Sequence, residues 1–167
     1  MRLVGYVRET AGPQEGQTAF TQSERIRRWA SDHGHQLVAV CQDVRQAGHA
    51  LGREGFRALL GIVNAGEVDA VVVASLEAFS LDKVLQEVML WDLRTRNVAV
   101  LSADDDDLPG LKDPPDDPTR LLVRDVLARV ADYREAHADA GPTMIAVDDG
   151  PADIVVELLP PDEANRS

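Results

Sequence analysis

The sequence predicts an α/β fold with a mainly parallel sheet and flanking helices, and two observations support this prediction. Short apolar runs alternate with stretches of helical periodicity along the first hundred residues, which is the pattern of βαβ units. Two of these runs, 3–7 and 69–75, break off into polar residues at their carboxyl ends. Ligands bind at the carboxyl ends of parallel strands, where strand order reverses, so we expect a site there.

The individual elements follow from local pattern, and their order is flavodoxin-like. Strands are expected at the apolar runs 3–7, 37–41, 69–75 and 98–102. Helices are expected at 15–31, 53–63 and 81–96, where apolar residues recur near a 3.6-residue period. Gly34 and the Asn64-Ala65-Gly66 segment are expected to stop the first two helices. Ser80 is expected to cap the third.

Composition divides the chain into four parts. Residues 1–103 form the predicted α/β domain. Residues 104–118 hold seven aspartates and four prolines, and so little apolar surface predicts an exposed loop. Residues 119–140 hold a long helix, Thr119–His137, followed by the expected stop Gly141-Pro142. An apolar stripe is expected along this helix, formed by Leu121, Leu122, Val126, Leu127 and Val130. Residues 141–167 form a tail with two strand-like segments, 144–147 and 153–159.

Charge restricts the class of partner. The 167 residues include 17 basic and 29 acidic ones, a net charge of −12. DNA affinity depends on neutralising phosphates with Lys and Arg, so we expect weak or absent DNA binding. A local basic patch of Arg25, Arg27 and Arg28 is the exception, on the first expected helix.

No cofactor, metal or membrane segment is expected. The single cysteine, Cys41, lies in an apolar run and is interpreted as a buried structural thiol. The aspartates 104–107 lack the alternating spacing and the glycine of a calcium loop. No run approaches the roughly 20 apolar residues of a membrane span, and the amino terminus does not have the pattern of a signal peptide. A soluble, cytoplasmic protein is expected.

Several motifs resemble the catalytic domain of the serine recombinases, the resolvase/invertase family, over about residues 1–137. The family opens with Tyr-x-Arg-x-Ser, and this chain has Tyr6-Val7-Arg8-Glu9-Thr10 followed by Gln14. The family arginine before Glu-Gly-hydrophobic matches Arg53 in G-R-E-G-F. The resemblance implies vestigial site positions at Thr10, Arg8, Arg53 and Glu77, with Tyr6 and Gln14 beside them.

The chain departs from the family where chemistry is concentrated. Threonine replaces the serine nucleophile at Thr10, and the family's Leu-Asp-Arg-Leu-x-Arg reads Leu76-Glu77-Ala78-Phe79-Ser80-Leu81. Both arginines of that segment are absent, and arginine stabilises the charge that grows on a transferring phosphate. We therefore expect Arg8 and Arg53 to pair with Glu77, Glu9 or Glu54 in a structural ion-pair network. Enzymatic activity is not expected.

Three functions remain open. The first is a recombinase-like domain without catalysis, acting as a regulatory or protein-interaction module with an unknown partner. The second is a recombinase or nickase of low activity that uses Thr10 with Arg8 and Arg53. The third is a domain that binds a small anion or metabolite. The family helix equivalent to Thr119–His137 mediates dimerisation, so the resemblance implies a homodimer. The alternative is that this helix folds back onto its own domain.

Overall fold

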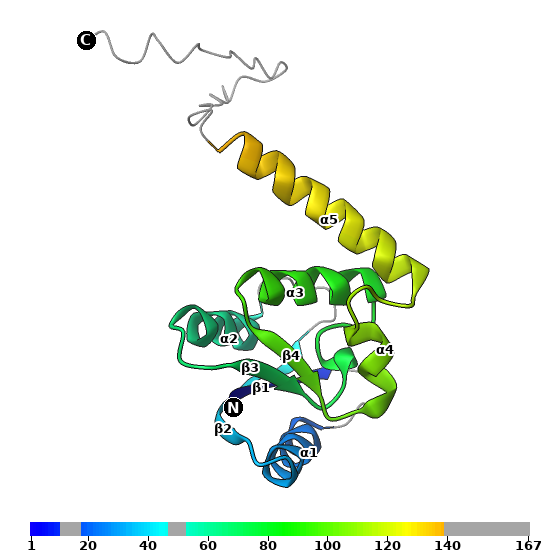
Figure 1. Cartoon of the computed structure of the whole chain (residues 1–167). Helices are drawn as coiled ribbons and strands as arrows, with labels where there is room; N and C mark the ends of the chain where they lie inside the picture. Colours follow the sequence, from blue (N-terminus) through cyan, green and yellow to red (C-terminus); the bar gives the residue numbers. More distant parts are fainter. Residues whose placement is uncertain (11–17, 47–52, 139–167) are drawn as a thin grey trace, which may run out of the picture. The chain divides into compact units, whose positions relative to one another are not determined.

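The sheet is parallel, as predicted, and has four strands. The structure is a computed structural model and describes residues 1–10, 18–46 and 53–138 (Figure 1). The strands are β1 (Arg2–Thr10), β2 (Gln36–Gln46), β3 (Ala70–Val73) and β4 (Ala99–Ser102), in the order β2-β1-β3-β4. All three pairings are parallel. The order reverses beside β1, so the ends of β1 and β3 are neighbours.

Helices cover both faces of this sheet. Helix α1 (Ala19–Asp32) lies on one face, while α2 (Glu54–Asn64) and α3 (Lys83–Thr95) lie on the other (Figure 1). Alternation along β1 divides the core accordingly: Leu3 and Val7 pack with Ile26 of α1, whereas Val4 and Tyr6 pack with α2 and α3. β3 is buried on both faces throughout, which explains its continuous apolar sequence.

Several element ends differ from expectation, and β1 extends to Thr10. β2 continues past Cys41 to Gln46, because its polar residues still pair with β1 as far as Thr10. Helix α3 begins at Lys83, and its cap is Asp82, whose carboxylate accepts from the amides of Val84 and Leu85. Ser80 instead accepts from the amide of Asp82, at 3.1 Å, so it shapes the turn before the cap.

The acidic segment 104–118, which we expected to be an exposed loop, contains two short helical turns. It contains a 3-10 turn, η2 (Asp105–Asp107), and a short helix, α4 (Leu108–Leu111). Asp107 holds it on the sheet by accepting from the amide of Leu76 at 2.7 Å and from the hydroxyl of Ser102. Side-chain hydrogen bonds of Asp107 thus hold the segment in place, together with Leu111, which packs against the core.

Helix α5 spans Pro118–Ala136, within one residue of expectation at each end. The chain divides into two compact units, Met1–Leu127 and Ala128–Ser167, and the division falls within this helix. In the first unit Arg120 and Arg124 of α5 are buried, whereas Leu121, Leu122 and Val126 are exposed. The expected apolar stripe therefore does not fold back onto the first unit.

Several sequence-based expectations lie outside the described residues. They are Gln14, the start of the first helix at 15–17, the stop Gly141-Pro142 and the strand-like tail segments. No described helix has the length and hydropathy needed to cross a membrane. Within residues 1–10, 18–46 and 53–138, no three His, Cys, Asp or Glu side chains gather as metal ligands would.

Candidate functional site

The carboxyl ends of β1 and β3 meet, as the strand order requires. Tyr6 and Arg8 face the α2–α3 side of the sheet, because alternate residues of a strand share a face. Glu9 faces the opposite side, where its Oε2 accepts from the amide of Ala19 at the start of α1, at 2.9 Å. Glu9 therefore acts as a helix-end acceptor and points away from Arg8.

Asp43 of β2 is the centre of this site, and it was not among the residues predicted from the sequence. Its carboxylate, 2% exposed, accepts from Tyr6 Oη at 2.9 Å, from the amide of Gly55 at 2.7 Å and from the amide of Phe56 at 3.1 Å. It thus joins β1, β2 and the first turn of α2. The position of Asp43, just after the apolar run 37–41 and at the carboxyl end of a strand, could have marked it as a site residue.

Tyr6 is held by aromatic packing as well as by Asp43. Its ring stacks on Phe79 at 5.7 Å between centroids and meets Phe56 edge-on at 5.5 Å. Burial raises the pKa of the Tyr6 hydroxyl; a hydrogen bond with Arg53 opposes that shift, and the carboxylate of Asp43 adds to it. Tyr6 therefore stays protonated and donates to Asp43.

Arg8 is a buried cation that is only partly hydrogen-bonded by the described part of the chain. It is 5% exposed, and Nη2 donates to the backbone carbonyl of Glu77 at 3.4 Å. Nε and Nη1 have no hydrogen-bond partner among the described residues. Burial and then the positive charge of Arg53 lower the pKa of Arg8, against smaller opposing effects of Tyr6 and Asp43. The side-chain amide of Gln22 in α1 holds the backbone of Arg8: it accepts from the Arg8 amide and donates to the Arg8 carbonyl.

Arg53 immediately precedes α2, at the N-cap position. It is 2% exposed, and its Nη1 donates to the backbone carbonyl of Phe79. Arg8 and Arg53 therefore both donate to the segment after β3, which contains the short helix η1 (Leu76–Ala78). This segment is the counterpart of the second family motif, and it contacts the two arginines through its backbone.

The expected ion pairs of these arginines do not form. The Glu77 residue is exposed, and only its carbonyl contacts Arg8. The Glu54 carboxylate pairs with Arg57 on the surface of α2. Among the described residues, no carboxylate lies within salt-bridge distance of Arg8 or Arg53. The buried carboxylate of the site, Asp43, accepts from Tyr6 and two amides instead.

The other family positions offer no further cation. Ala78 is buried, and Leu81 is 60% exposed. Thr10 is the last residue of β1 and pairs with Gln46. The structure thus brings Tyr6, Arg8 and Arg53 together with Asp43. It leaves the Glu77 carboxylate outside this group, and Gln14 lies outside the described residues.

Chemically, this arrangement presents two guanidiniums and one carboxylate beneath a backbone segment. Guanidinium donors with no partner suit an oxyanion or a phosphate oxygen. A buried arginine that keeps two donors unused is costly in a folded protein. Of the two guanidiniums, Arg8 has two donors without a partner among the described residues, and little of its side chain reaches the surface.

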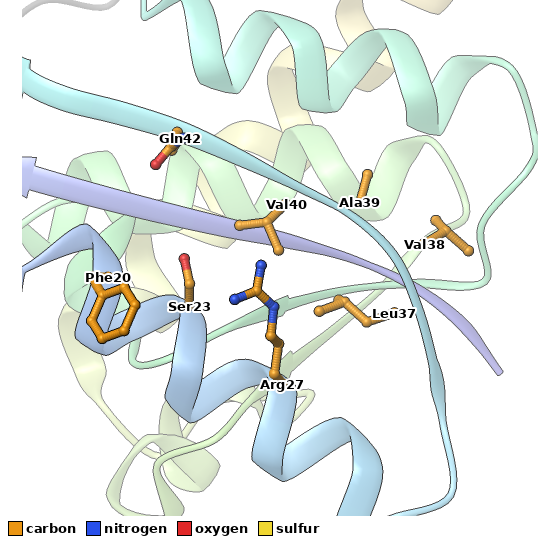
Figure 2. Close-up of a pocket in the computed structure, with 8 residues that line it drawn as sticks. All are labelled: Phe20, Ser23, Arg27, Leu37, Val38, Ala39, Val40 and Gln42. Atoms are coloured by element: carbon orange, nitrogen blue, oxygen red, sulfur yellow. The ribbon is translucent and has the colours of Figure 1, made fainter.

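A separate groove of about 480 Å³ lies between α1 and β2. Figure 2 shows Arg27 directed from α1 toward β2, with Phe20 and Ser23 beside it. The expected basic patch is partly neutralised. Arg27 pairs with Glu24 at 2.7 Å, Arg25 pairs with Asp104 at 3.4 Å, and Arg28 is exposed.

The fold and the placement of Tyr6, Arg8 and Arg53 define a recombinase-type α/β domain. The family model described as "Resolvase, N terminal domain" matches residues 3–140, so the chain belongs to the resolvase family. No curated protein sequence matches it.

Solved structures agree on the fold. The N-terminal catalytic domain of TP901-1 integrase is 16% identical with a TM-score of 0.56, covering 85% of this chain and 100% of that one. A resolvase family site-specific recombinase from Streptococcus pneumoniae is 19% identical with a TM-score of 0.56, covering 84% and 93%. The C-terminal catalytic domain of ISC1926 TnpA, an IS607-like serine recombinase, is 19% identical with a TM-score of 0.53, covering 81% and 84%.

Proposed function

We propose that this resolvase-family domain does not cleave DNA and acts as a homodimeric interaction module. One observation carries the proposal. The two arginines retained at the site, Arg8 and Arg53, are 5% and 2% exposed and donate to backbone carbonyls, while positions 78 and 81 hold alanine and leucine. The site therefore lacks two of the family's guanidiniums, and the two that remain belong to buried side chains.

The expected loss of rate is large. Removing one transition-state donor typically costs about 10²–10³ in rate. Two such losses would cost on the order of 10⁴–10⁶ if they were independent, and groups acting together are seldom additive. Threonine in place of serine adds a β-methyl that restricts χ1 at the nucleophile position. The net charge of −12 also argues against DNA cleavage, because a negatively charged protein is repelled by the phosphates of DNA.

The exposed stripe of α5 supports the homodimer. Leu121, Leu122 and Val126 are about half or more exposed, and exposed apolar patches of this kind mark interfaces. The stripe lies on a single helix, so two copies can bury it against each other in a symmetric, isologous contact.

Trapping of covalent protein–DNA adducts tests the absence of cleavage. The protein is incubated with supercoiled DNA under denaturing-quench conditions, beside a Thr10→Ala variant. We expect no adduct and no nicking above the Thr10→Ala background. A Thr10-dependent adduct would show that the domain is an enzyme. A Thr10→Ser, Ala78→Arg, Leu81→Arg variant asks in parallel whether restoring the family residues restores any nicking.

The unused donors of Arg8 favour anion binding as a second function. Nε and Nη1 of this buried side chain have no partner among the described residues. Inorganic sulfate or phosphate bound there would raise the thermal midpoint of the wild-type protein and not that of Arg8→Met, since a ligand stabilises only the state it binds. An equal rise in both proteins would indicate a general salt effect and exclude the site.

A further inference from the structure

In its first turns, helix α5 packs on its own domain with its charged side inward. Arg120 and Arg124, one turn apart, are each 7% exposed. Leu121, Leu122 and Val126 are 49%, 63% and 50% exposed. A helix packed on its own domain ordinarily turns its apolar stripe toward the core. Contacts within the first unit must therefore stabilise the packing in which the Arg120 and Arg124 face of α5 is buried.

The inward arginines meet a single buried carboxylate. Glu87 of α3 is 0% exposed. Its Oε2 accepts from Arg120 Nη1 at 3.0 Å, and its Oε1 accepts from Arg124 Nε. Arg120 Nη2 also donates to Gln86 Oε1. Each oxygen of the buried carboxylate thus has its own guanidinium from α5.

The remaining donors bind the connection that leads into α5. Arg124 donates to the carbonyl of Gly110 at 3.1 Å and to that of Lys112 at 2.6 Å. Arg94 of α3 reaches Glu87 at 3.4 Å and the carbonyl of Leu111 at 3.2 Å. At Gly110 a Cβ would lie 3.3 Å from the Arg120 guanidinium carbon, so the close approach suits glycine. One network of hydrogen bonds and ion pairs therefore joins α3 and α5 to residues 110–112.

Turning the helix over would break this network. Packing Leu121 and Leu122 inward would move Arg120 and Arg124 away from Glu87. The carboxylate would then stay buried with only Arg94 near it. Leaving a buried charge without its hydrogen-bonded partners is strongly unfavourable, so the network disfavours the apolar-inward packing of the same helix.

We propose that Glu87, Arg120 and Arg124 form a selector that holds the apolar stripe of α5 outward for a second copy of the chain. They are positioning residues: they contact no partner and determine which face of α5 a partner meets. The proposal rests on the proposed homodimer for its use, but the selection of the face is a property of the single chain. The two ideas can therefore fail separately.

Thiol labelling of the stripe tests the selector. Leu122→Cys is made in a Cys41→Ala background, and its reaction with a maleimide is followed at a concentration where light scattering shows only monomer. Glu87→Leu, which places an apolar side chain of similar size at the buried position, should slow the reaction at least about fivefold, the result of a matching fall in the outward population. Lys112→Gln is the control, because it breaks only the exposed Lys112–Asp116 pair.

The outcomes separate the two ideas. An unchanged or faster reaction in Glu87→Leu overturns the selector, because α5 would then keep its stripe outward, or detach, without the carboxylate. If circular dichroism shows Glu87→Leu to be unfolded, Glu87→Gln takes its place. Loss of folding in both overturns the proposal by making the network a requirement of the whole fold. A wild-type protein that stays monomeric at high concentration removes the homodimer and leaves the labelling result standing.

Discussion

Tyr6 donates its phenolic hydrogen to Asp43 at 2.9 Å, and this bond links the central strand β1 to the edge strand β2 beneath the start of α2. The same carboxylate accepts two amides of α2. Asp43 therefore holds the helix that carries Arg53 at its N-cap position, and the geometry of the site depends on it.

Removing the Asp43 carboxylate should destabilise the fold severely. Asp43→Ala leaves three buried donors unsatisfied, and we expect a loss of about 3–5 kcal/mol in the free energy of unfolding. Tyr6→Phe removes one donor and should cost about 1.5 kcal/mol. Urea denaturation of both variants measures the difference. If Asp43→Ala costs no more than Tyr6→Phe, Asp43 is not the centre of the network.

Two glycines of α2 should respond in opposite directions to alanine. A Cβ on Gly55 would lie 2.5 Å from the backbone carbonyl of Gln42, whereas one on Gly61 meets nothing within 4 Å. Gly61→Ala should therefore stabilise the protein by up to about 1 kcal/mol through helix propensity. Gly55→Ala must displace β2 and should destabilise it by about 1–3 kcal/mol, the usual cost of overpacking. Thermal midpoints of the two variants decide, and equal shifts would contradict the tight α2–β2 contact.

Asp117 should make the start of α5 sensitive to acid. Its carboxylate accepts from Lys83 at 2.8 Å and from the amides of Thr119 and Arg120. The hydrogen bond from Lys83, followed by those from the amides, lowers the pKa of Asp117 from 3.8 to about 2. A lowered pKa in the folded state means that the stabilisation is present above about pH 4 and is lost as the pH falls toward 2.

Asp117→Asn provides the measurement for this pH dependence. The variant keeps an acceptor for the amides but has no carboxylate to titrate. The difference in stability between wild type and variant should be largest above pH 4 and shrink below it. A difference that stays constant from pH 6 to pH 2.5 would show that the charge of Asp117 contributes nothing.

The proposed homodimer should depend on the exposed stripe of α5. Changing Leu122 and Val126 together to aspartate places two charges on the apolar face of α5 and should give a monomer by light scattering. Glu135→Gln, an exposed position on the opposite face of the same helix, serves as the control for mutating α5 and should leave the dimer intact. A wild-type protein that is already monomeric at tens of micromolar would refute the dimer.

Much of the fold follows from local pattern alone. The alternation of apolar strands with periodic helices predicted the parallel sheet, because burial on both faces requires continuous apolar strands such as Ala70–Val73. The convergence of Tyr6 and Arg8 with the segment after β3 followed from the same pattern, since neighbouring parallel strands end at one edge. Arg53 was located by resemblance to a family motif rather than by any physical signal of its own.

Tertiary structure decided the partners of the charges. The sequence by itself determined that Arg8 and Arg53 stand near acidic residues, and from it we wrongly expected pairs with Glu9, Glu54 and Glu77. Only the fold placed Asp43 at the centre and turned Glu9 to the other face of β1. Only the fold turned α5 with its arginines inward. Which acid meets which base depends on contacts between residues such as Glu87 and Arg124, 37 positions apart, and local periodicity contains no information about such contacts.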